Sequence, residues 1–319
     1  MNMSENEKLY LRIKILYENR DEEKVDEGVG IKNNEIYLQN MSKSFGDKAW
    51  FLKLIKPEID TIVDFGGGAG EFCEFIRDKV GRPMKFVIID NNRDFKSQAE
   101  AKGFTVFESL DELMSWRQFN PNTSLLNMSS VIHEIYSYAD DFYDDVGYFW
   151  SQVGKCSFRQ IAIRDMSMNK NSYRTAPTDA ILWVSENVFR DGGLTVKGVP
   201  LAEIMQSFEN VWGEICDLKT RRVDVKNLVH FLIKYRYVEN WEREVEENYL
   251  PVSQDKLASI LTSAGYKFSH KESSKLDFYA KTWDKDFKLR IPDNDGYREI
   301  FSRWLKTLST HIKWMLEHS

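Results

Sequence analysis

Residues 61–72 read TIVDFGGGAGEF and place a short apolar run directly before a cluster of glycines. The run Thr61–Phe65 has the length and composition of a buried strand. After the glycines, Phe72, Phe75 and Ile76 recur at the spacing of an amphipathic helix. Glycine accepts the backbone angles of a tight turn and lets a ligand approach the main chain. The stretch therefore predicts a strand, a glycine turn and a helix whose N-terminus can face a ligand.

The chain around this stretch alternates between apolar runs and helical patterns. Further strands are predicted at 85–89, 104–107, 123–128, 160–163, 266–270 and 310–316, with helices between most of them. Such alternation implies βαβ units with right-handed crossovers, which bring the carboxyl ends of the parallel strands to one edge of the sheet. We expect an α/β, Rossmann-like fold with a mostly parallel seven-stranded sheet, helices on both faces and a helical insertion.

The alternation stops between residues 167 and 252, where helical patterns dominate at 178–189, 199–212 and 226–248. We therefore expect three parts. Residues 1–57 form an N-terminal helical extension or lid, residues 58–166 and 253–319 form the sheet domain, and residues 167–252 form the insertion.

Composition narrows the class of protein. The 319 residues are 42% hydrophobic and 29% charged, which is ordinary for a globular protein. The net charge of −6 does not favour nucleic-acid binding by the surface as a whole. The three cysteines lack metal-ligand spacing, so we expect reduced thiols and no metal site. Neither a signal-like nor a membrane-spanning stretch is present, which predicts a cytoplasmic protein; the oligomeric state stays open.

The spacing of the glycines distinguishes between cofactors. A dinucleotide turn, G-x-G-x-x-G/A, needs a small third residue, but Glu71 or Cys73 occupies that position here. A glutamate at the start of the helix would also repel a pyrophosphate, so an NAD-dependent oxidoreductase is excluded. The pattern Asp64-x-Gly66-x-Gly68-x-Gly70 instead resembles the first motif of class I S-adenosylmethionine-dependent methyltransferases.

This resemblance covers roughly residues 58–166 and 253–280 and implies S-adenosylmethionine as the cofactor. Asp90 ends the second strand at the place where the family's acidic residue holds the ribose hydroxyls, and a carboxylate can accept two hydrogen bonds from a diol. The cofactor-binding residues implied in this way are Asp64, Gly66, Gly67, Gly68, Gly70, Asp90, Asn91, Ser109, Asn127 and Met128.

Methyl transfer is an in-line displacement, and the enzyme contributes mainly by aligning the reacting groups. Catalytic candidates should follow the fourth and fifth strands at the carboxyl edge. The segment 130–134 resembles that of many small-molecule methyltransferases, and its His133 is a candidate general base, unless it only caps or packs its helix. Arg164 and Asp165 end the fifth strand, where they could orient a polar acceptor or form a structural ion pair.

The insertion contains a run of basic and aromatic residues between 219 and 243, which suits a phosphate-bearing acceptor or forms a solvated helix face with its aromatic residues in the core. We expect an enzyme that methylates oxygen or nitrogen of a polar small-molecule or nucleotide-like acceptor bound by the insertion. Two alternatives stay open: an RNA or DNA methyltransferase that uses this run, and a non-catalytic binding subunit. The [DN]-P-P-aromatic motif of base-amine methyltransferases is absent at 127–130.

Overall fold

The computed structural model describes residues 3–19, 44–139, 142–191, 193–287 and 296–319. These residues form two compact units, each assembled from separate stretches of the chain. A sheet unit comprises Tyr37–Met166, Val252–Ser273 and His311–Ser319, and a helical unit comprises Met1–Ile36, Ser167–Pro251 and Ser274–Thr310. Of residues 1–57, expected as one extension, the described residues 3–19 belong to the helical unit and the described residues 44–57 belong to the sheet unit.

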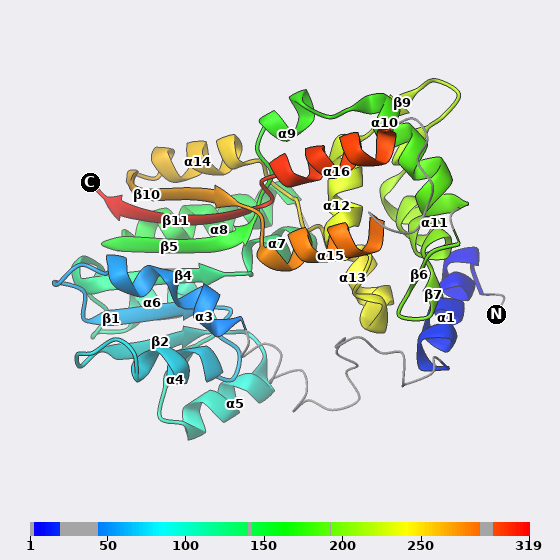
Figure 1. Cartoon of the computed structure of the whole chain (residues 1–319). Coiled ribbons are helices and arrows are strands. Elements are labelled where there is room, and N and C mark those ends of the chain that lie inside the picture. Colours follow the sequence, from blue (N-terminus) through cyan, green and yellow to red (C-terminus); the bar gives the residue numbers. More distant parts are fainter. Residues whose placement is uncertain (1–2, 20–43, 140–141, 192, 288–295) are drawn as a thin grey trace. The chain divides into compact units, whose positions relative to one another are not determined.

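The sheet unit contains the predicted seven-stranded, mostly parallel sheet, and the fold prediction is confirmed (Figure 1). The order across the sheet is β10-β11-β5-β4-β1-β2-β3. Neighbouring pairs from β3 to β5 are parallel, and β11 lies antiparallel to β5. The strand bounds are β1 Thr61–Phe65, β2 Lys85–Ile89, β3 Thr105–Phe107, β4 Ser124–Ser129, β5 Gln160–Met166, β10 Tyr266–Ser274 and β11 His311–His318.

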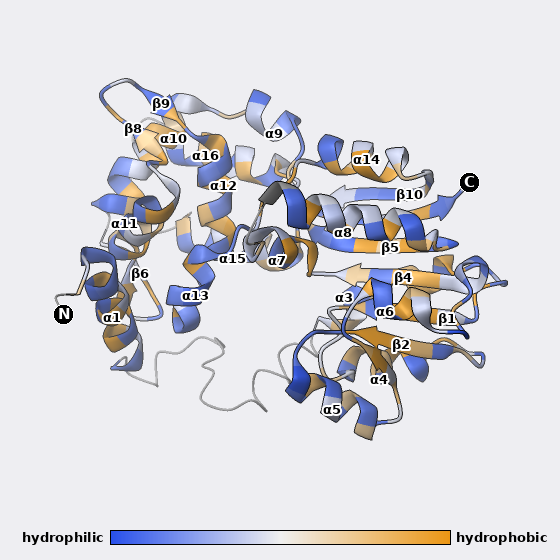
Figure 2. Cartoon of the chain, turned by 180° about the vertical axis from the view of Figure 1, so that it is seen from behind, coloured by the Kyte–Doolittle hydropathy of each residue, from blue (hydrophilic) through white to orange (hydrophobic). Residues whose placement is uncertain are grey.

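The central strands are buried along most of their length because helices cover both faces of the sheet (Figure 2). Alternate residues of β1 join two separate apolar clusters, Val63 on one face and Ile62 on the other. The helices on the Val63 face are α6 Leu110–Ser115, α7 Ile132–Ser137, α8 Phe142–Cys156 and α14 Gln254–Ser263. Those on the Ile62 face are α3 Phe45–Lys48, the 3₁₀ helix η2 Ala49–Leu54, α4 Glu71–Arg77 and α5 Arg93–Ala101.

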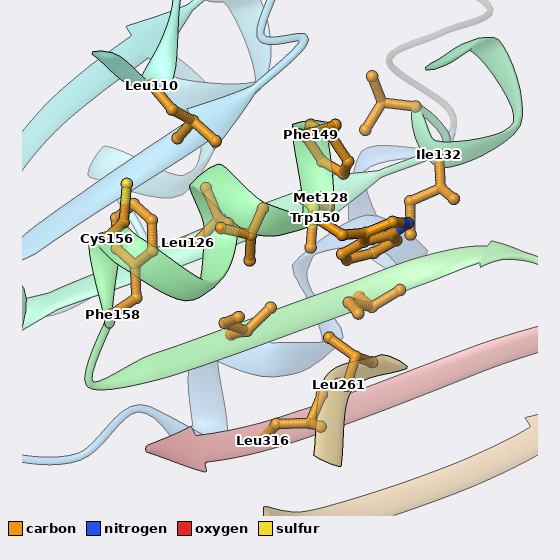
Figure 3. Close-up of a cluster of buried hydrophobic side chains, with 14 of the residues drawn as sticks. Leu110, Leu126, Met128, Ile132, Phe149, Trp150, Cys156, Phe158, Leu261 and Leu316 are labelled. Atoms are coloured by element: carbon orange, nitrogen blue, oxygen red, sulfur yellow. The ribbon is translucent and has the colours of Figure 1, made fainter. Parts of the chain in front are cut away.

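The apolar cluster on the Val63 face packs β4 against the helices α7 and α8 (Figure 3). Met128 of β4 and Trp150 of α8 are buried in it, and the Trp150 indole N–H donates to the Tyr136 hydroxyl of α7 at 3.0 Å. Because α7 directly follows β4, this packing fixes the loop at the carboxyl edge of the sheet.

The helical unit consists of short helices and two small hairpins. Its elements are α1 Glu5–Glu18, α9 Asn171–Arg174, α10 Thr178–Val184, the π-helix η4 Ser185–Arg190, β6 Thr195–Val196, β7 Val199–Pro200, α11 Leu201–Trp212, β8 Cys216–Asp217, β9 Arg222–Val223, α12 Val225–Lys234, the 3₁₀ helix η5 Val238–Asn240, α13 Trp241–Glu246, α15 Asp277–Phe287 and α16 Tyr297–Thr307. The single helix predicted over 226–248 is therefore three pieces. None of the described helices has both the length and the apolarity needed to cross a bilayer.

Candidate functional site

The glycine turn joins β1 to α4 and uses left-handed backbone at three positions. Gly66, Gly68 and Gly70 have φ of 69°, 54° and 86°. A Cβ at Gly66 would lie 2.6 Å from a Val131 methyl, and one at Gly70 would lie 2.8 Å from the Phe104 ring. A Cβ at Gly68 would meet no described atom within 4 Å. Gly66 and Gly70 are thus required by packing, whereas Gly68 presents open backbone.

Asp90 lies beside this open backbone, as expected from the spacing. Its Oδ2 accepts a hydrogen bond from the Gly68 N–H at 2.9 Å, and its Oδ1 accepts one from the Asn92 N–H at 2.9 Å. The Asn92 side chain in turn caps α5, while the predicted Asn91 is exposed between them. The end of β2 therefore holds the Asp90 carboxylate against the glycine turn.

Asp64 is buried beneath the turn. Its Oδ1 accepts a hydrogen bond from the Asn127 amide at 2.7 Å, and the Cys73 thiol donates to its Oδ2 at 3.7 Å. Burial raises the pKa of Asp64 to about 6, although the Asn127 bond and the nearby Lys48 act in the opposite direction. In the part of the chain that the structure describes, Asn127 Oδ1 and Ser129 Oγ are buried without a hydrogen-bond partner. The end of β4 thus offers acceptor atoms that the described residues leave unsatisfied.

His133 and Asp165 meet at the carboxyl edge, as the strand ends suggested. His133 Nδ1 lies 2.9 Å from Asp165 Oδ1, and because an ionised carboxylate only accepts, Nδ1 is the donor. The backbone N–H groups of Val131, Ile132 and Met166 also donate to Asp165, at 3.0, 2.7 and 2.7 Å. Burial alone would raise the pKa of Asp165, but His133 and these donors hold it below its ordinary value. In this tautomer the basic nitrogen of the neutral imidazole is Nε2.

Arg164 does not pair with Asp165, which corrects the expected Arg164–Asp165 arrangement. Successive residues of a strand point to opposite faces, so the two side chains separate. Arg164 Nε donates to Asp47 Oδ2 at 2.6 Å, and another guanidinium nitrogen donates to Ser130 Oγ at 2.9 Å. Asp47 also accepts a hydrogen bond from Lys313 of β11. Arg164 therefore ties the segment before β1 to the edge of the sheet.

Two further predicted residues have local structural contacts. Ser109 is the N-cap of α6, and its Oγ accepts a hydrogen bond from the Glu112 N–H at 3.2 Å. Met128 is fully buried in the apolar cluster of Figure 3. Both side chains are therefore engaged in contacts within the sheet unit, and their role in cofactor binding stays a prediction.

Sequence reasoning missed Lys48, the last residue of α3. Burial lowers the pKa of Lys48 and the Arg164 guanidinium acts in the same direction, whereas the carboxylates of Asp64, Asp165 and Glu134 act in the opposite direction. Lys48 makes no side-chain hydrogen bond or ion pair with any residue that the structure describes. Its sequence context, SFGDKAW, matches no motif, so only the fold could reveal its position.

The basic and aromatic residues of 219–243 do not form one surface. The buried Lys234 ammonium donates to the backbone carbonyls of Glu244 and Glu247, and Arg236 pairs with Asp286 at 2.6 Å. Tyr235 and Trp241 are buried. Since internal contacts occupy these side chains, the run does not support a nucleic-acid interface.

The fold and this edge together define a Rossmann-like α/β protein with a glycine turn after β1, an acidic residue after β2 and a histidine–carboxylate pair after β4 and β5. No protein-family model matches the sequence. No curated protein matches it either.

Several solved structures are similar to the chain. The plantazolicin methyltransferase BamL is 10% identical, with 99% of this chain and 97% of that one covered and a TM-score of 0.41. The geranyl diphosphate C-methyltransferase of Streptomyces coelicolor A3(2) is 10% identical, with 98% of each chain covered and a TM-score of 0.43. A SAM-dependent methyltransferase of Archaeoglobus fulgidus is 12% identical, with 88% and 99% covered and a TM-score of 0.43.

Proposed function

We propose that the protein is an S-adenosylmethionine-dependent methyltransferase. The proposal rests on one contact, the hydrogen bond from the Gly68 N–H to Asp90 Oδ2. This contact places a carboxylate beside backbone where an added Cβ would meet no described atom within 4 Å. A carboxylate suits the two hydroxyls of a ribose, and open glycine backbone suits the close approach of a nucleoside.

The residues at the end of β1 and β4 fit the amino-acid part of this cofactor. Asn127 Oδ1 is a buried acceptor without a described partner, and a buried polar atom of this kind is costly unless a donor reaches it. The neighbouring Asp64 carboxylate adds negative charge. An ammonium group would supply the missing donor and a balancing charge. When bound, S-adenosylmethionine supplies a methyl group on a positively charged sulfur.

His133 is proposed to accept the proton that an oxygen or nitrogen acceptor loses on methylation. Asp165 holds the imidazole in the tautomer whose Nε2 is basic and stabilises the imidazolium that forms. General base catalysis of this kind contributes about 10²- to 10⁴-fold. Arg164 is proposed to position this edge, since its contacts are with Asp47 and Ser130.

The acceptor is proposed to be a polar small molecule or a nucleotide-like compound, recognised by the insertion at 167–252. Within the helical unit an open depression of about 420 Å³ supports this role. It is lined by Tyr173, Arg222, Asp217 and Asp224 among others, so it offers aromatic, cationic and anionic contacts to a polar ligand.

Calorimetric titration with S-adenosylmethionine and S-adenosylhomocysteine tests the proposal. We expect the wild-type protein to bind both and Asp90→Ala to lose about 100-fold in affinity, the effect of one or two charge-assisted hydrogen bonds. Asp94→Ala, an exposed carboxylate on the adjacent helix, should bind like the wild type. A wild-type protein that binds neither ligand would overturn the proposal, and binding without turnover of any acceptor would favour a non-catalytic subunit.

A further inference from the structure

Ser130 directly follows β4 and has left-handed backbone, with a φ of 60°. A residue other than glycine is strained in this region and keeps the conformation only where its surroundings hold it there. Glycine would form the same turn without this strain. The serine at this position therefore directs attention to the contacts that its side chain makes.

Both the main chain and the side chain of Ser130 bind Arg164 of β5. The Ser130 N–H donates to the Arg164 carbonyl oxygen at 2.7 Å, and Ser130 Oγ accepts a hydrogen bond from the Arg164 guanidinium at 2.9 Å. The Arg164 side chain is itself held in place, because it is buried and its Nε donates to Asp47 Oδ2 at 2.6 Å. Two hydrogen bonds therefore fix the turn after β4 to the end of β5.

The residues that follow this turn converge on the carboxylate of Asp165. The backbone N–H groups of Val131 and Ile132 donate to Asp165 Oδ2 at 3.0 and 2.7 Å. The next residue, His133, places its Nδ1 2.9 Å from Asp165 Oδ1. One carboxylate thus binds both the N-terminus of α7 and the imidazole of the candidate base, and the direction of the chain at Ser130 makes this possible.

Val131 also lies against the glycine turn. It is buried, and a Cβ added to Gly66 would lie 2.6 Å from one of its methyl groups. The segment that begins at Ser130 therefore contacts the candidate cofactor turn through Val131 and carries the candidate base two residues later. A change in the backbone at Ser130 would move both contacts.

We propose that Ser130 is a positioning residue, which holds the His133 imidazole on Asp165 and at a fixed place relative to the glycine turn. This inference rests on the proposed function, in which His133 accepts the proton of the methyl acceptor. Alignment of the reacting groups is the main contribution of the enzyme to such a displacement. A base that is fixed by a hydrogen-bonded turn is aligned before the acceptor binds. Arg164 then acts on the reaction through Ser130.

Proton NMR of the ligand-free protein tests this role without any acceptor. An imidazole N–H that donates to a buried carboxylate exchanges slowly with water and gives a separate downfield resonance, which is assigned to His133 by its absence from His133→Gln. Valine at position 130 disfavours left-handed backbone and cannot accept the bond from Arg164. We expect Ser130→Val to accelerate the exchange of this proton by about 10-fold or more, because the contact opens more often.

Two further variants at position 130 separate the hydroxyl group from the backbone. Ser130→Ala removes only the hydroxyl and should accelerate the exchange by a smaller factor. Ser130→Asn should exchange like the wild type, because asparagine tolerates left-handed backbone and its amide oxygen can accept the bond from Arg164.

Ser157→Val is the matched control, because Ser157 is another left-handed serine of the sheet unit, with a φ of 50°. It precedes β5 at the opposite edge of the sheet, and its Oγ donates to the Gly154 carbonyl at 3.0 Å. Both valine variants should unfold at a lower denaturant concentration than the wild type, but only the one at position 130 should change the His133 resonance.

The proposal is overturned if either Ser130→Val or Ser130→Ala exchanges the His133 proton like the wild type. It is also overturned if Ser157→Val accelerates the exchange as much as Ser130→Val, which would indicate a structural role. A wild-type protein that binds no S-adenosylhomocysteine would instead contradict the proposed function itself.

Discussion

Replacing Asp64 by asparagine should make the protein more stable and its cofactor binding weaker. Burial raises the pKa of Asp64 from 3.8 to about 6. Ionising this carboxyl group at neutral pH therefore costs the folded protein free energy that the unfolded chain does not lose. The difference between the two pKa values lowers the free energy of unfolding at pH 7 by about 3 kcal/mol. Asparagine keeps the shape of the side chain and can still accept the hydrogen bond from Asn127.

The gain in stability should depend on pH in a defined direction. The folded-state pKa of Asp64 is raised, so the group contributes stability below about pH 4 that is lost as the pH rises through 6. Asp64→Asn has no such loss, so its advantage over the wild type should reach up to about 3 kcal/mol above pH 6 and vanish below about pH 4. For a domain of this size that advantage corresponds to a rise of roughly 5–10 °C in Tm.

Calorimetric unfolding of the ligand-free protein between pH 4 and 8 measures this effect, and titration with S-adenosylhomocysteine measures the loss of affinity. Asp78→Asn, which removes an exposed carboxylate after α4, should change the free energy of unfolding by no more than about 0.5 kcal/mol. A variant at position 64 that is less stable than the wild type at pH 7, or equally shifted at every pH, would refute the reasoning.

Three further predictions concern the same edge. His133→Gln should lower kcat by about 10²- to 10⁴-fold and leave the affinity for S-adenosylhomocysteine within a factor of a few, as single-turnover kinetics and calorimetry can establish. Gly70→Ala should lower the free energy of unfolding by roughly 2 kcal/mol or more, because its Cβ would meet the Phe104 ring, whereas Gly68→Ala should be less destabilising and mainly weaken binding; chemical denaturation compares them. Cofactor affinity should fall as the pH drops below about 6 and Asp64 is protonated, which a calorimetric pH series would detect.

Local sequence patterns were sufficient for the seven strands of the large sheet but not for the short hairpin strands of the helical unit. The first two parallel strands are short apolar runs followed by Gly66 and Asp90, and burial on both faces of the sheet favours such runs. The glycine turn and Asp90 also lie close together in the structure, as their spacing in the sequence predicted, because β1 and β2 are adjacent and parallel. Helices were less predictable. The sequence pattern over 226–248 suggested one helix, but α12 ends at Lys234 and the chain folds back on itself. The Lys234 ammonium then donates to the backbone carbonyls of Glu244 and Glu247.

The parts of the site that sequence reasoning missed depend on contacts between distant segments. The separation of Arg164 from Asp165 could have been foreseen, because the two-residue period of a strand sends adjacent side chains to opposite faces. The partner of Arg164 could not, since Asp47 lies 117 residues away in a segment without a motif. Lys48 is the next residue of the same helix, so its place at this edge also depends on that distant contact. A residue that belongs to no motif and whose contacts come from distant segments cannot be recognised from the sequence around it. Exchanging Asp47 for asparagine therefore tests the connection: if its ion pairs with Arg164 and Lys313 hold this segment to the sheet, the variant should unfold at a lower denaturant concentration than the wild type, and an unchanged midpoint would contradict that role.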